Sequence, residues 1–133
     1  MNIFYNQAKH NLDFLGCVKA NYPEQFFDWK ITILFYISIH LIKCLAYKRG
    51  VNIGSTHYDI ERALNPSRGM QVTPFPDWAW RKYSRLFKYS RDSRYDGILD
   101  ERIIRIAQEK NFIECEKIFD DFLKYMASNE ITL

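Results

Sequence analysis

The sequence is poor in the residues that interrupt a chain. Among its 133 residues are only 5 glycines and 4 prolines, which excludes collagen-like and flexible low-complexity proteins. An all-β protein needs a turn every ~8–12 residues, so this composition also argues against strands. Hydrophobic residues make up 47% of the chain and aromatic residues 17%, too many for a disordered protein. We therefore expect a single domain of long helices over residues 1–133.

The sequence also lacks the cysteine patterns of metal and disulfide proteins. Its three cysteines, Cys17, Cys44 and Cys115, lie far apart and form no Cys-x-x-Cys pair. They have no ligand spacing with the histidines, so neither a zinc site nor another cofactor is expected. Each lies in an apolar stretch, which predicts buried, reduced thiols and a cytoplasmic location.

Signals for the membrane are absent as well. The N-terminus has no signal-peptide pattern. The most apolar run, residues 31–39, is shorter than the ~20 residues of a membrane span. No membrane association is therefore expected.

Apolar spacing and turn signals predict five helices. Asp28 and Asp77 are expected N-caps, and Thr56 with Asp59 three residues later is an expected capping box. The second helix is apolar on nearly every side, which places it in the middle of a bundle. Four long helices and one short helix with short connections predict an all-α, up-and-down antiparallel bundle. The helices span about residues 2–21, 28–49, 57–64, 77–92 and 98–128.

Positive charge is concentrated in one segment. Residues 77–94 carry six basic and two acidic side chains, a local charge of +4, although the net charge of the whole chain is only +3. Arg81, Arg85 and Lys88 form a stripe at helical spacing, interleaved with aromatic residues. The stripe fits either a surface for a phosphate backbone or an ordinary solvated helix face.

The end of this basic segment contains a first group of candidate site residues, Ser90, Arg91, Arg94 and Tyr95. Ser90 and Arg94 are four residues apart and share the side of the helix that faces the bundle. A guanidinium group there needs either a phosphate ligand or an internal carboxylate partner.

Two histidines and one further arginine are the other candidates. His40 lies in the most apolar helix, where it is either a hydrogen-bonded core residue or an acid–base group. His57 and Arg62 lie at the two ends of the short helix and either reach a common groove or are unrelated surface residues. No Ser-His-Asp order, Gly-rich phosphate loop or His-Glu-x-x-His motif is present.

Taken together, these residues resemble a known family. The order and spacing are similar to those of the HEPN superfamily (higher eukaryotes and prokaryotes nucleotide-binding), in small stand-alone prokaryotic members, from about Ala8 to Phe122. The matching residues are Asp28-Trp29, Thr32, Phe35-Tyr36, His40, His57, Arg62, Tyr83-x2-Leu86 and Ser90-Arg91-x2-Arg94-Tyr95.

The resemblance implies a helical bundle that forms a homodimer and handles RNA or a nucleotide. Many members are metal-independent ribonucleases in toxin–antitoxin or defence systems, often paired with a nucleotidyltransferase-type antitoxin. Their active site is an Arg-x4-6-His motif, which this chain lacks. Arg49 precedes His57 by too many residues, and His57 and Arg62 have the right separation in the reverse order.

We therefore expect a non-catalytic or divergent RNA- or nucleotide-binding module. One alternative is a ribonuclease toxin that uses His40 or His57 as its catalytic group. Another is a structural module for dimerisation or protein interaction. The expected ligand-binding residues are Arg62, Ser90, Arg91, Arg94 and Tyr95.

Overall fold

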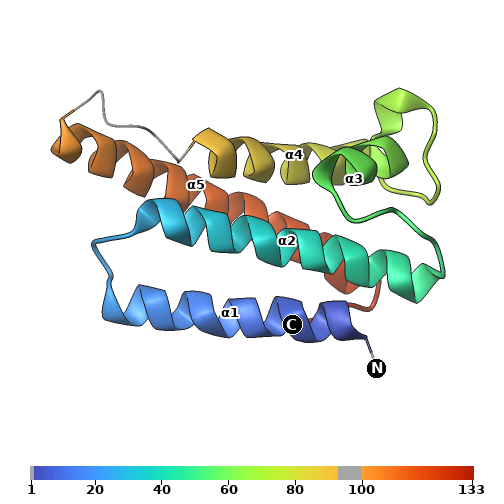
Figure 1. The fold of residues 1–133 in the computed structure, drawn as a ribbon, viewed down its shortest axis with the longest axis horizontal. Helices are drawn as coiled ribbons and strands as arrows, with labels where there is room; N and C mark the ends of the chain where they lie inside the picture. Colours follow the sequence, from blue (N-terminus) through green and yellow to red (C-terminus); the bar gives the residue numbers. More distant parts are fainter. Residues whose placement is uncertain (1, 93–99) are drawn as a thin grey trace.

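The computed structural model describes residues 2–92 and 100–133, and this part of the chain contains helices and no strand. The expected all-α class is confirmed. The helices lie alongside one another, with α2 between α1 and the pair α4 and α5 (Figure 1). They are α1 (Ile3–Asn21), α2 (Phe27–Arg49), α3 (His57–Leu64), α4 (Asp77–Asp92) and α5 (Glu101–Ser128), with a short 3-10 helix at Pro66–Arg68.

Helix α2 is the centre of the bundle, because α1, α4 and α5 all pack against it. Fourteen of its 23 residues are buried. It is long and apolar enough to cross a membrane by length and composition, but 72% of its apolar window is buried inside the bundle. A core helix meets the same criterion, so the finding fits the central position of α2.

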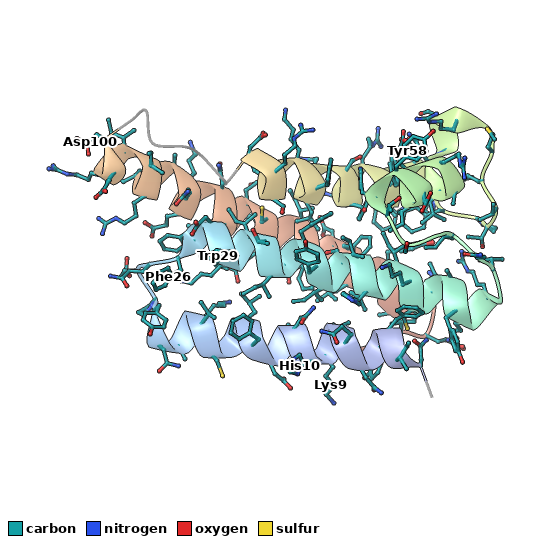
Figure 2. All side chains as sticks on the ribbon, in the orientation of Figure 1. Lys9, His10, Phe26, Trp29, Tyr58 and Asp100 are labelled. Atoms are coloured by element: carbon teal, nitrogen blue, oxygen red, sulfur yellow. The ribbon has the colours of Figure 1, made fainter. Side chains whose placement is uncertain are left out.

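One side of α2 is not covered, contrary to the expectation of a helix buried all round. Trp29, Tyr36 and Tyr47 are exposed, and His40 and Lys43 are half-buried. Their spacing of seven, four, three and four residues places them on one face of the helix. We call these five residues the α2 stripe. Figure 2 shows Trp29 on this uncovered side.

Side-chain caps begin helices α1, α3 and α5, whereas α2 begins without one. Asn2 caps α1 through its side-chain oxygen, and the expected capping box of Thr56 and Asp59 at α3 is confirmed. The expected Asp28 cap is wrong. Helix α2 begins one residue earlier, behind Phe26 in a left-handed conformation with no side-chain cap. Asp28 instead lies in the first turn of α2, and the other expected cap, Asp77, is the first residue of α4. In both positions the negative charge is favourable to the helix dipole.

Helix α1 is fixed to α2 near both of its ends by polar contacts. At the start, Asn2 Nδ2 donates a hydrogen bond to the carbonyl of Cys44 at 3.3 Å. At the end, Lys30 Nζ donates to the carbonyl of Tyr22 at 2.6 Å. Lys30 is fully buried, and its ammonium lies 4.4 Å from the centroid of the Phe27 ring. Burial lowers the pKa of Lys30, and the carbonyl and the ring compensate its charge.

The cysteines differ from one another more than the sequence indicated. All three are free thiols; Cys44 and Cys115 are buried, but Cys17 is exposed on α1. The expectation of three buried thiols is therefore wrong for Cys17. Burial raises the pKa of Cys44, and it raises the pKa of Cys115 to about 12.

These differences predict the reactivity of the thiols. A disulfide-exchange reagent such as DTNB at pH 8 should modify Cys17 rapidly in the native protein and the two buried thiols slowly, because only thiolates that solvent reaches are nucleophilic. All three should react at once in denaturant. A Cys17→Ser variant should lose the rapid phase alone. Rapid reaction of two or more thiols in the native protein would contradict the packing around Cys44 and Cys115.

Candidate functional site

The position of His57 follows from the local structure at the start of α3. His57 is the first residue of this helix, directly after the capping residue Thr56. The turn before it is tight, because Asp59 accepts hydrogen bonds from the backbone N–H groups of Ser55 and Thr56. A Cβ atom on Gly54 would lie 2.4 Å from the Cβ of Asp59. Only glycine therefore fits there, and the start of α3 is fixed.

The imidazole of His57 packs against α4. Its ring stacks on Phe87, with the ring centroids 3.6 Å apart and the planes 10° apart. Its Nδ1 shares a hydrogen bond of 2.8 Å with the hydroxyl of Tyr83. Tyr83 is fully buried, and Phe35 of α2 lies against both Tyr83 and Phe87. His57 is thus held by the aromatic core from one side.

This environment favours the neutral form of His57. Burial lowers its pKa, and the charge of Arg91 lowers it further, while Glu61 opposes both effects. Burial raises the pKa of Tyr83, so its hydroxyl stays protonated. When Tyr83 donates the hydrogen bond, Nε2 of His57 carries the imidazole proton and is the atom left for a ligand.

Arg91 lies on the same aromatic ring. Its guanidinium carbon is 5.5 Å from the centroid of Phe87. The side chain is exposed, and its ion pair with the adjacent Asp92 is long, at 3.7 Å. The ring of Phe87 therefore contacts both the imidazole of His57 and the guanidinium of Arg91. We call His57, Tyr83, Phe87 and Arg91 the Phe87 cluster.

Three of the other four basic residues of α4 have carboxylate partners. Arg81 pairs with Asp77 at 3.2 Å, and Lys82 pairs with Asp121 at 3.0 Å. Arg85 pairs with Glu114 at 3.1 Å. Lys88 is exposed and has no ion pair within the described part of the chain. Much of the +4 segment is therefore balanced by acids of the protein itself, which fits a solvated helix face.

The remaining candidates are spread over the molecule. His40 is half-buried in the α2 stripe, and its Nδ1 lies 2.8 Å from the carbonyl of Tyr36. Burial lowers the pKa of His40. Ser90 is buried on the core side of α4, next to the exposed Arg91. Arg94 and Tyr95 lie outside the described residues.

Arg62 lies apart from the Phe87 cluster. Its guanidinium is 5.7 Å from the ring centroid of Tyr58, which Figure 2 labels on α3. It also lines a hollow of about 440 Å³ together with Asp59 and Met70, and neither His57 nor Arg91 lines that hollow. The structure therefore does not bring His57 and Arg62 to one groove.

No pattern in the sequence pointed to the contact between Phe87 and His57. Tyr83, Phe87 and Arg91 follow at steps of four residues along α4, which shows that they share a face but not that His57 joins them. His57 and Phe87 are 30 positions apart in the sequence, so only the tertiary fold brings them into contact. Within residues 2–92 and 100–133, no group of three or more His, Cys, Asp or Glu side chains could hold a metal ion.

Comparisons of this chain with protein-family models, curated proteins and solved structures find no match.

The lowered pKa of His57 predicts how stability depends on pH. In the unfolded chain the pKa of His57 is ~6.5. Between this value and the lower pKa of the folded state, the imidazole is protonated in the unfolded state but mostly neutral in the folded state. The free energy of unfolding should therefore fall as the pH drops below ~6.5 and through the lowered folded pKa. A His57→Asn variant keeps an oxygen near the position of Nδ1 and should show a shallower fall in urea titrations. Identical slopes in both proteins would contradict the burial of this imidazole.

Proposed function

We propose that this protein is a HEPN-like helical module that binds the phosphate groups of RNA or a nucleotide at the Phe87 cluster. The observation that carries the proposal is the pair of groups on one ring, the imidazole of His57 and the guanidinium of Arg91. We also propose the finer architecture expected from the sequence, which is an up-and-down antiparallel bundle of four long helices. The cytoplasmic location expected from the sequence remains a proposal as well.

The chemistry of the cluster suits a phosphate. A guanidinium donates two parallel hydrogen bonds to phosphate oxygens. Arg91 is exposed and only loosely paired, so binding a phosphate does not require it to break a strong internal ion pair. The neutral His57 adds one N–H donor without a fixed charge. Arg94 and Tyr95, three and four residues beyond Arg91, belong to the proposed ligand surface as sequence-based candidates.

The α2 stripe supports RNA over a phosphate ion alone. Exposed aromatic rings next to basic groups provide stacking surfaces for unpaired bases. The ring centroid of the buried Phe35 lies 6.0 Å from that of Tyr36 and 5.4 Å from that of Phe87. Phe35 therefore connects the α2 stripe to the Phe87 cluster. The partner class implied by the family resemblance, a nucleotidyltransferase-type antitoxin, is part of the same proposal.

Binding should depend on Arg91 more than on another arginine of α4. We expect Arg91→Ala to weaken the binding of a short single-stranded RNA and to lower the slope of log K against log salt by ~0.7, the value for one lost phosphate contact. Fluorescence anisotropy across a salt series measures both quantities. Arg81→Ala is the matched control, since it removes the same charge from a residue that already pairs with Asp77. Equal effects of the two substitutions would reject the site.

A divergent ribonuclease is the second candidate, and the lowered pKa of His57 beside Arg91 favours it. For this reaction His57 would take the other tautomer, in which its Nδ1–H donates to the hydroxyl of Tyr83 and Nε2 is free. Nε2 would accept the proton of a 2′-hydroxyl as that oxygen bonds to phosphorus, and the 5′-oxygen would leave with a proton from water. Arg91 would stabilise the negative charge of the transition state.

This candidate makes a separate prediction. Purified protein should shorten single-stranded RNA in the presence of EDTA, and His57→Ala should slow cleavage by ~10²-fold or more. His10→Ala, on the exposed side of α1, should cleave at the wild-type rate. If the protein binds RNA but does not cleave it, the ribonuclease candidate is contradicted and the binding module is supported.

A further inference from the structure

Arg62 is a candidate ligand residue that the Phe87 cluster does not use, and it lines a hollow of its own. The hollow has a volume of about 440 Å³, which is within the range of small-molecule sites. Its residues come from α3, from the turn before this helix and from the loop after it, at the end of the bundle where Figure 1 shows α3. Asp59 and Arg62 follow His57 by two and five residues, so they lie on the other side of α3. We call this site the α3 hollow.

Three polar side chains line the α3 hollow, and each offers a different chemistry. The guanidinium of Arg62 has no ion pair in the described part of the chain and lies 5.7 Å from the ring centroid of Tyr58. Hydrogen bonds lower the pKa of Asp59, so its carboxylate is charged at neutral pH. Two backbone N–H groups occupy two of its about four acceptor positions. The amide oxygen of Asn52 accepts a backbone hydrogen bond at 2.9 Å, which leaves its NH₂ group as a donor.

The two charges of the hollow are neighbours that do not pair with each other. Asp59 and Arg62 are three residues apart on α3, a spacing at which opposite charges attract. The charge of Arg62 lowers the pKa of Asp59, but the two side chains form no ion pair. Asp59 is held by the turn before the helix, and Arg62 lies over the ring of Tyr58. A ligand that carries an ammonium and a carboxylate close together can therefore bind both residues at once.

The rest of the lining is aliphatic. Ile53 and Ala63 are buried, whereas Met70 is 61% exposed and Val72 is 49% exposed. A ligand that covers these two side chains removes apolar surface from water. None of the described lining residues is aromatic, so a nucleobase would find no ring to stack on. One acid and one base also give the hollow no net charge that would attract a phosphate.

We propose that the α3 hollow binds a free α-amino acid with an aliphatic side chain, such as leucine. The guanidinium of Arg62 and the amide of Asn52 donate hydrogen bonds to the carboxylate of the amino acid. Its ammonium donates to the carboxylate of Asp59, and its aliphatic side chain packs on Met70 and Val72. The α3 hollow is a different site from the Phe87 cluster and does not depend on phosphate binding there.

A titration of the full chain with L-leucine tests the proposal directly. Nitrogen-15 NMR spectra should show saturable shifts of the amide signals of Gly54, Asp59 and Ala63, because these backbone groups surround the hollow. The amide signals of Phe87 and Arg91 should not move. No saturable shift at the hollow, up to the solubility of leucine, would overturn the proposal.

Analogues of leucine test each contact without changing the protein. L-leucinamide lacks the carboxylate, N-acetyl-L-leucine lacks the ammonium, and glycine lacks the aliphatic side chain. Each should bind at least about tenfold more weakly than leucine, because each leaves one feature of the hollow without a partner. N-acetyl-L-leucine tests the role of Asp59, whose substitution would remove the capping box of α3. An analogue that binds as tightly as leucine would contradict the assigned contacts.

A substitution tests whether the guanidinium is the carboxylate ligand. Arg62→Gln should weaken leucine binding at least about tenfold. Arg81→Gln is the matched control, since it removes the same charge from an arginine of α4 that pairs with Asp77, and it should bind leucine like the wild type. Circular dichroism checks that both variants keep the fold. Equal leucine binding by the two variants would overturn the proposal.

The two proposed sites can be told apart with one further comparison. Arg62→Gln should still bind RNA at the Phe87 cluster, and Arg91→Ala should still bind leucine with the affinity of the wild type. Loss of leucine binding in Arg91→Ala would place the amino acid at the Phe87 cluster and overturn the assignment to the α3 hollow.

Discussion

Burial of α2 is the constraint on which the rest of the structure depends. Three helices pack against it, and its core residues Ile37 and Leu41 are completely shielded from water. Removal of apolar surface from water is the main favourable term in folding. Three packed helices do not close the full circumference of a fourth, however, so one strip of α2 faces solvent. The α2 stripe is therefore a consequence of the packing arrangement as much as of the sequence.

The Phe87 cluster takes its rigidity from this same core. Phe87 reaches Phe35 of α2 on its inner side and His57 on its outer side, so one side chain connects the centre of the bundle to the surface. Polar groups fixed in this way lose little further freedom when a ligand binds. The hydroxyl of Tyr83 adds direction to the imidazole, because a hydrogen bond specifies orientation where stacking alone does not.

Local chemistry was predictable from the sequence, and packing between distant segments was not. Thr56 and Asp59 interact across three residues, so their capping box needs no tertiary information. Cys17 lies in an apolar stretch that was expected to be buried, yet α1 packs mainly on α2 and leaves its other side in water. The Asp28 cap failed because Phe26 adopts a left-handed conformation that starts the helix earlier. The contact of His57 with Phe87 depends on how α3 folds back over α4, and no periodicity encodes it.

The polar attachments of α1 to α2 near its two ends affect how this helix can separate from the bundle. A helix held only by side-chain packing can fray from one end, turn by turn. Here Asn2 holds the first turn and the carbonyl of Tyr22 is bound by a buried ammonium just beyond the last one. Release of either end alone leaves the other anchored and exposes an unsatisfied polar group. Helix α1 should therefore dissociate as one cooperative unit.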